Sequence, residues 1–161
     1  MIEIRKPKEK DLSKIREILA QWNDQEYTEI YFTRIKNEIS GQTEFNMKFW
    51  VATDDEEVLG IIGLCDLSPD LLSFAKTPKP GQLKILYIDN KDRGKGIGKT
   101  LTQFVEKEAS KNDYEELLVK SSEIYKNTAW GFYEKMSYKP VGLIDNKDNI
   151  KKSKIFEKIL E

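Results

Sequence analysis

The spacing of apolar residues changes repeatedly along this chain, and the changes predict a mixed α/β fold. Segment 2–5 (IEIR) has the character of a short strand. After Asp11, a suitable N-cap, apolar residues recur every three or four positions over 12–22, which indicates a helix with one buried face. A second, less regular helix is predicted over 28–40, ending at Gly41.

Shorter apolar runs in the middle of the chain predict strands. Segments 48–53 and 58–67 are expected to pair around a turn at 54–57, and 83–88 (LKILYI) is expected to form the next strand. Segment 68–82 is rich in proline and turn formers, so it is predicted to be a loop.

The last third of the chain repeats the alternation of helix and strand, and no linker divides it. Residues 1–161 are therefore predicted to form one domain. The remaining predicted elements are a helix with apolar positions 97, 101, 104, 105 and 109, a strand at 116–120, a helix at 127–136 capped by Asn127 or Thr128, and strands at 138–144 and 152–160 joined across the polar loop 145–152.

Composition narrows the class of protein. The net charge is −1 and arginine occurs at only four positions, which disfavours nucleic acid as a partner. No apolar run approaches the roughly 20 residues of a membrane span, so no membrane is expected. Cys65 is the single cysteine, which excludes an intrachain disulfide and favours a cytoplasmic protein.

The chain has no histidine, which restricts its chemistry. Ser-His-Asp and Cys-His catalysis are excluded, most zinc sites are excluded with them, and no metal is expected. Cys65 lies within an apolar strand with no histidine to activate it, so we interpret it as a core residue. Proton transfer is left to tyrosine, lysine, carboxylates or water.

The glycine-rich stretch 92–100 (DRGKGIGKT) is the most informative motif in the chain. It fails the nucleotide phosphate-loop pattern because Arg93 stands where that pattern requires its first glycine. It also fails the dinucleotide pattern, because Lys99 stands where the last glycine belongs.

What remains is Arg-x-x-Gly-x-Gly between a strand and a helix. Gly96 and Gly98 allow backbone N–H groups to close around an anion, and the start of the next helix adds further donors. Lys95 and Lys99 add positive charge, so a diphosphate would suit the turn. The alternative is a plain glycine turn that begins a helix.

Segment 83–109, with NTAWGFYEKMSYKPVG at 127–142, resembles the GNAT-type N-acetyltransferases, and the opening strand and helix are compatible with that family. The resemblance implies a single-domain GNAT-like α/β fold. Its central sheet would be mixed and mostly antiparallel, flanked by helices, with the fourth and fifth strands splayed around acetyl-coenzyme A.

The resemblance also implies particular contacts to acetyl-coenzyme A. Backbone groups of Leu86, Tyr87 and Ile88 would bind the pantetheine and the acetyl carbonyl, and the N–H of Ile88 would stabilise the oxyanion. The diphosphate would be held by the backbone N–H groups of Arg93, Gly94, Lys95, Gly96, Ile97, Gly98 and Lys99.

In the second motif, Tyr133 matches the family's proton donor to the departing thiolate, although it could instead belong to a buried helix face. Asn127 either contacts the coenzyme or serves only as an N-cap. Ser137 replaces a glycine of the family pattern at a helix end. Glycine tolerates the positive φ of such an end and serine would be strained there, so either the serine is strained or the helix ends differently. No carboxylate lies at the start of 83–88, so Asp66 or acids within 22–31 would assist deprotonation through water.

The reaction so predicted is transfer of the acetyl group of acetyl-coenzyme A to a primary amine by direct attack in a ternary complex. A non-catalytic coenzyme A-binding module of the same fold is one alternative, and a phosphate-loop nucleotide hydrolase is a weaker one.

The acceptor would be a small-molecule or peptide amine, and a homodimer is left open. Acids and aromatics at 21–32 would suit a cationic amine or form an exposed loop.

Overall fold

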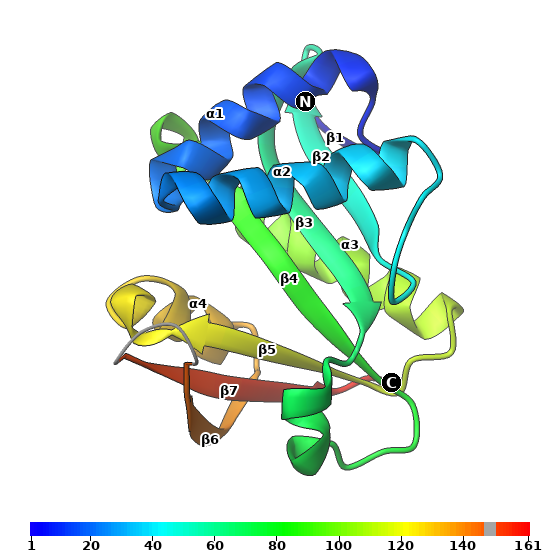
Figure 1. Cartoon of the computed structure of the whole chain (residues 1–161), viewed down its shortest axis with the longest axis vertical. Helices are drawn as coiled ribbons and strands as arrows, with labels where there is room; N and C mark the ends of the chain where they lie inside the picture. The colour runs from blue at the N-terminus through cyan, green and yellow to red at the C-terminus, as the bar shows by residue number, and fades with distance from the viewer. Residues whose placement is uncertain (147–150) are drawn as a thin grey trace. The chain divides into compact units, whose positions relative to one another are not determined.

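The computed structural model describes residues 1–146 and 151–161, which fall into two compact units (Figure 1). The first unit comprises Met1–Cys65 and Lys84–Lys107, and the second comprises Asp66–Leu83 and Glu108–Glu161. The strands are β1 (Ile2–Arg5), β2 (Lys48–Asp54), β3 (Glu57–Asp66), β4 (Pro80–Ile88), β5 (Glu116–Ser122), β6 (Lys139–Asp145) and β7 (Lys152–Ile159). The α-helices are α1 (Leu12–Trp22), α2 (Gln25–Ile39), α3 (Ile97–Lys111) and α4 (Ala129–Lys135), and short 3-10 helices are η1 (Glu9–Asp11), η2 (Pro69–Phe74), η3 (Asn90–Asp92) and η4 (Glu123–Tyr125).

The strands hydrogen-bond in the order β1-β2-β3-β4-β5-β7-β6, which makes a seven-stranded mixed sheet. The β4–β5 pair is parallel, and the β1–β2, β2–β3, β5–β7 and β6–β7 pairs are antiparallel. The parallel ladder joins Pro80–Leu83 to Glu116–Val119, at the start of each strand. The predicted mixed, mostly antiparallel α/β fold with flanking helices is confirmed.

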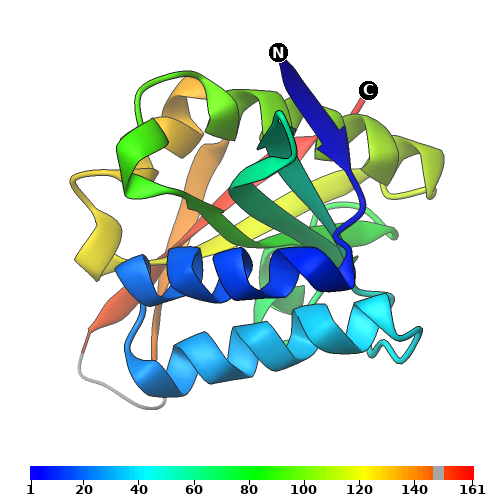
Figure 2. The ribbon, with the colours of Figure 1, turned by 90° about the horizontal axis from the view of Figure 1, so that it is seen from above.

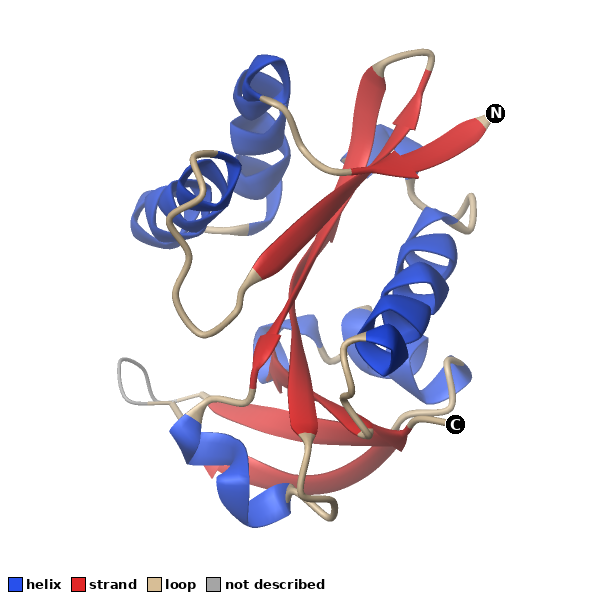
Figure 3. Ribbon diagram, turned by 90° about the vertical axis from the view of Figure 1, so that its right-hand side faces the viewer, coloured by secondary structure: helices blue, strands red, loops and turns tan. Residues whose placement is uncertain are grey.

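In the first unit, helices cover both faces of the strands. Helices α1 and α2 run side by side on one face and α3 lies on the other (Figures 2 and 3). Along β2, the side chains of Phe49 and Val51 pack into the core under α1 and α2, while Trp50 meets Phe104 of α3 at 5.8 Å between ring centroids. Because both faces are covered, β2 is apolar on both sides instead of alternating. Cys65 is buried in the same core, as predicted.

Two local features of the first unit differ from the sequence-based expectation. Helix α2 begins at Gln25, not at 28, because the carboxylate of Asp24 caps it by accepting a hydrogen bond from the Tyr27 N–H at 2.9 Å. The expected exposed loop within 21–32 is therefore wrong, since most of that segment is helical.

The second unit contains a small core formed by Leu71, Leu118 and Ile155. Part of the predicted loop 68–82 is structured, because η2 brings Leu71 into this core and β4 already begins at Pro80. Strands β6 and β7 pair as predicted, while part of the predicted connecting loop 145–152 lies outside the described residues. No described helix is long and apolar enough to cross a membrane.

The second unit also holds a pair of buried glutamates on neighbouring strands. Glu116 is fully buried, and its Oε1 accepts hydrogen bonds from the backbone N–H groups of Lys76 at 2.8 Å and Thr77 at 2.7 Å. Glu157 is equally inaccessible and forms an ion pair with the Lys76 ammonium at 3.0 Å. Burial, together with the neighbouring Glu116 carboxyl group, raises the pKa of Glu157. The Oε2 atoms of both carboxyl groups have no hydrogen-bond partner among the described residues, and we expect a proton shared between the two groups to satisfy them.

We expect the variant Glu157→Gln to lose a pH dependence that the natural chain has. A raised pKa in the folded state contributes stability that is complete below the ordinary glutamate pKa and is lost as pH rises through the folded-state value. Glutamine keeps a donor toward Glu116 and does not ionise. Thermal unfolding followed between about pH 5 and pH 8 should therefore show the melting temperature of the variant rising relative to that of the natural chain as pH rises. The exposed neighbour Glu115→Gln is the control, and parallel curves for Glu157→Gln would contradict the shared proton.

Candidate active site

The residues expected to contact the pantetheine lie at the end of β4, after a backbone irregularity. Ile85 has a φ of 58°, a conformation that a β-branched residue rarely adopts. Leu86, Tyr87 and Ile88 follow it and are half-buried. Strand β3 approaches closely here, since a Cβ on Gly60 would lie 2.6 Å from the Ile88 Cδ1 atom. A Cβ there would also lie 3.1 Å from the Tyr87 carbonyl oxygen, so glycine allows the two strands to approach closely.

The glycine turn after η3 has the geometry of an anion cradle. Gly94 has a φ of 77° and Gly96 a φ of 81°, and a Cβ built on either would meet no atom within 4 Å. Helix α3 begins at Ile97, and the Thr100 N–H donates to the Gly96 carbonyl at 3.0 Å. The N–H groups that precede Thr100 in this first turn have no intrahelical acceptor. The turn thus presents open backbone donors, as a diphosphate requires.

Two of the cationic side chains of the turn, those of Lys95 and Arg93, contact other side chains. The Lys95 ammonium forms an ion pair with Asp92 at 3.0 Å, and the Arg93 guanidinium lies 4.9 Å from the centre of the Trp22 ring. Lys99 is exposed on the first turn of α3. Burial alone would raise the pKa of Asp92, but hydrogen bonds from Lys95 and Lys91 outweigh it and lower that pKa. Asp92 is therefore a buried carboxylate that holds Lys95.

Tyr133, the predicted proton donor, lies on α4 in the second unit and is buried. Its ring is 5.3 Å from that of Phe132, 5.8 Å from that of Tyr138 and 5.6 Å from that of Phe156. Burial raises the pKa of its phenol. A tyrosine hydroxyl is protonated at neutral pH even with its ordinary pKa of about 10, and this is the state that a proton donor needs.

The position of Tyr133 is fixed by the way α4 ends. The Tyr138 N–H donates to the Tyr133 carbonyl and the Ser137 N–H to the Glu134 carbonyl, both at 3.0 Å, which is a Schellman motif. Ser137 takes its left-handed position with a φ of 71°. The contact between the Tyr133 and Tyr138 rings is the apolar contact that accompanies such motifs. The position that holds glycine in the family pattern is thus filled by a strained serine, and the helix ends normally.

We expect Ser137→Gly to stabilise the chain by about 0.5–1 kcal/mol, because glycine relieves a left-handed penalty of about 1–2 kcal/mol and costs about 0.5–1 kcal/mol in chain entropy. The midpoint of urea unfolding measures the change. Ser40→Gly is the matched control, since Ser40 follows α2 with a φ of −85° and has no such strain to relieve. Equal shifts for both variants would count against the strain at Ser137.

The structure bears on the roles predicted for Asn127 and Asp66. Thr128, not Asn127, is the N-cap of α4, so the capping role for Asn127 is wrong and its coenzyme contact stays a prediction. Asp66, considered as a relay for the amine proton, accepts a hydrogen bond from the Tyr114 hydroxyl at 2.5 Å. Gln82, directly ahead of the segment 83–88 that begins without a carboxylate, is buried and accepts hydrogen bonds from Ser68 at 2.8 and 3.0 Å. The described residues offer no group of three or more metal-ligating side chains.

Sequence reasoning missed the residues that hold the turn in place. Lys14 and Gln21 of α1 contact Asp89, at the end of β4. The available signal was chemical: Asp89 and Asp92 are acids in a segment predicted to bind an anion, and such acids need cations of their own.

The chain matches the family model of the acetyltransferase (GNAT) domain over residues 18–154, and it belongs to this family. It is 34% identical to human N-acetyltransferase 8B over 94 residues, which cover 58% of this chain and 39% of that protein. The match therefore spans well under half the length of this curated relative.

Solved structures show the same fold. Arabidopsis thaliana NAA60 in complex with acetyl-CoA is 17% identical, with a TM-score of 0.80 over 99% of this chain and 98% of that one. The PaiA N-acetyltransferase from Thermoplasma acidophilum, in complex with coenzyme A, is 22% identical, with a TM-score of 0.70 over 99% of both chains.

Proposed function

We propose that this chain transfers the acetyl group of acetyl-coenzyme A to a primary amine by direct attack, with both substrates bound at once. The observation that carries the proposal is the pair of left-handed, unobstructed glycines, Gly94 and Gly96, ahead of the first turn of α3. In a chain of the GNAT family, this turn is suited to a coenzyme diphosphate. The two neighbours described above, NAA60 and PaiA, are solved with acetyl-CoA and coenzyme A respectively, which supports the same ligand here.

The residues would divide the work between binding and proton transfer. The N–H groups of 93–99 would hold the diphosphate, and the backbone of Leu86 and Tyr87 would align the pantetheine. When bound, acetyl-coenzyme A supplies a thioester carbonyl that an amine can attack without a covalent enzyme intermediate. The N–H of Ile88 would stabilise the negative charge that develops on the carbonyl oxygen.

The attacking nitrogen would lose a proton to water, and Tyr133 would donate a proton to the departing sulfur. A chain without histidine is compatible with this scheme, because positioning of the two reactants supplies much of the rate. We propose that residues 1–161 act together as one acetyltransferase domain. The acceptor is a small-molecule or peptide amine.

Thioester cleavage measured against a panel of amines tests this proposal. Acetyl-coenzyme A should raise the melting temperature, ATP with magnesium should not, and free coenzyme A should appear only with an accepted amine. Coenzyme binding without turnover on any amine would instead support a binding module of the same fold. Equal thermal shifts with ATP and magnesium would reject acetyl-coenzyme A as the specific ligand.

A further inference from the structure

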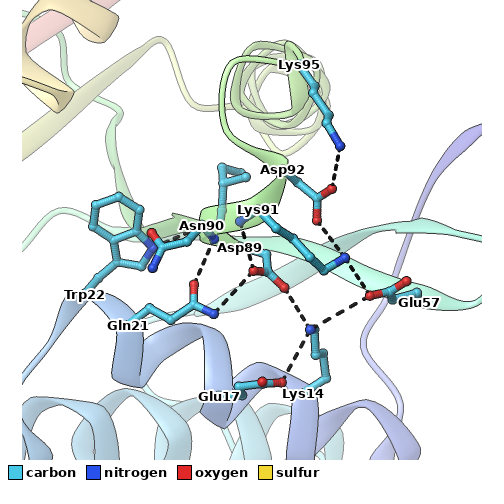
Figure 4. Close-up of polar contacts among 11 residues, drawn as sticks. Lys14, Glu17, Gln21, Trp22, Glu57, Asp89, Asn90, Lys91, Asp92 and Lys95 are labelled. Atoms are coloured by element: carbon cyan, nitrogen blue, oxygen red, sulfur yellow. Dashed lines mark hydrogen bonds and ion pairs between the residues drawn. The ribbon is translucent and has the colours of Figure 1, made fainter.

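Helix α1 holds the chain at the point where it leaves β4 (Figure 4). The indole N–H of Trp22 donates to the Ile88 carbonyl at 2.8 Å. The residue before it on α1, Gln21, accepts a hydrogen bond from the Asn90 N–H at its Oε1 atom at 2.9 Å. These bonds connect side chains of α1 to backbone groups on both sides of Asp89. The start of the turn is therefore set by a helix distant from it in sequence.

Lys14 is the charged centre of this contact. Its ammonium lies 2.7 Å from the Asp89 Oδ2 atom, and also 3.3 Å from Glu17 and 3.9 Å from Glu57. In Figure 4 the Lys14 side chain points away from α1, between these carboxylates and toward Asp89. The other contacts of Asp89 are longer, since Gln21 and the Lys91 N–H each approach its Oδ1 atom at 3.3 Å. Lys14 is the nearest cation to a carboxylate that is 3% exposed.

The charges of the turn explain why this contact matters for an anion. Asp89 and Asp92 are buried carboxylates directly ahead of the two left-handed glycines. Asp92 is neutralised by Lys91 at 3.3 Å and Lys95 at 3.0 Å, both within the turn. Asp89 takes its cation from α1. Without that cation, the unbalanced negative charge of Asp89 would oppose a diphosphate.

Both members of the Lys14–Asp89 pair are charged. Burial alone would raise the pKa of Asp89, but the hydrogen bond from Lys14 helps to lower it. The same hydrogen bond raises the pKa of Lys14. The pair therefore persists across neutral pH and does not act as a switch.

We propose that Lys14, acting through Asp89, is a positioning residue for the diphosphate-binding turn. Lys14 fixes the end of β4, and it cancels the negative charge of Asp89. This inference rests on the proposed function, because it concerns the affinity of the same turn for coenzyme A. Lys14 itself is not proposed to touch the coenzyme.

The test is the dissociation constant of coenzyme A, measured by titration calorimetry well below the melting temperature of each variant. We expect Lys14→Met to weaken binding about tenfold or more, because it leaves Asp89 buried without its cation. Adding Asp89→Asn removes the unbalanced charge and keeps an oxygen to accept from Lys91 and Gln21. The double variant should therefore bind within about threefold of the natural chain.

Lys10→Met is the matched control, because Lys10 pairs with Glu56 on the β2–β3 turn, away from Asp89, and it should leave the dissociation constant unchanged. An unchanged constant in Lys14→Met, even with a lowered melting temperature, would reduce Lys14 to a stabilising residue and overturn the proposal. Failure of the double variant to recover would overturn it as well. If Lys14→Met does not fold, the dissociation constants of Asp89→Asn and of the double variant are compared with that of the natural chain. A double variant that binds coenzyme A about tenfold more weakly than the natural chain then overturns the proposal. If the natural chain itself does not bind coenzyme A, the proposed function fails first.

Discussion

Replacing Gly96 by glutamate should abolish coenzyme binding, with a loss of affinity of at least about a hundredfold. The substitution places a carboxylate where we propose that the diphosphate lies, and like charges in contact cost several kcal/mol. It also forces a side chain onto a backbone with a φ of 81°. The thermal shift produced by acetyl-coenzyme A, followed by a titration with coenzyme A, measures the loss.

Gly41→Glu separates the charge effect from the backbone strain. Gly41 has a φ of 79°, and a Cβ added there would also meet no atom within 4 Å, but the residue follows α2. Both variants should lose similar stability, and only Gly96→Glu should lose binding. Full affinity in Gly96→Glu would place the diphosphate elsewhere and remove the observation on which the proposed function depends.

Replacing Tyr133 by phenylalanine should lower kcat by about a hundredfold or more, since a positioned proton donor contributes about 10²–10⁴-fold. The ring and its contacts with Phe132, Tyr138 and Phe156 are kept, so the fold and the affinity for acetyl-coenzyme A should change little. Steady-state kinetics with the best amine of the panel would show the loss in kcat with little change in the KM for acetyl-coenzyme A.

Tyr138→Phe is the control from the same aromatic cluster. It removes a hydroxyl from a tyrosine that is 2% exposed and packs against Tyr133, yet we assign no chemistry to it. Its kcat should stay within about threefold of the natural value. A normal kcat in Tyr133→Phe would leave Tyr133 as a packing residue of α4, which was the alternative interpretation of its pattern.

The elements that could be predicted from sequence are those with a local cause. The apolar stripe of α1, the apolar runs of β2 and β3, and the glycines before α3 each follow from neighbours within a few residues. The start of α2 was misplaced because its cap, Asp24, stood among other acids and aromatics without a distinctive spacing. The positive φ of Ser137 is one of the two outcomes that the family pattern left open, because the glycine found there tolerates this conformation.

The parts that could not be predicted depend on contacts between distant residues. Nothing near Lys14 in the sequence indicates that its partner is Asp89, because many lysines occupy the polar face of a helix. The left-handed backbone of Ile85 goes against the preference of its own side chain, so only the surrounding structure can impose it. The raised pKa of Glu157 likewise depends on the pairing of β5 with β7, which brings Glu116 and Glu157 together.

The Schellman end of α4 bears on how mutational scans of this protein are interpreted. Tyr133 supplies both the carbonyl that closes the motif and the ring that packs on Tyr138. An alanine at this position would keep the carbonyl but would remove the ring and its contact with Tyr138 together with the hydroxyl, and the lost turnover would be credited to the hydroxyl alone. Only a substitution that preserves the ring separates chemistry from architecture here, so data from alanine libraries will overstate the catalytic weight of this residue.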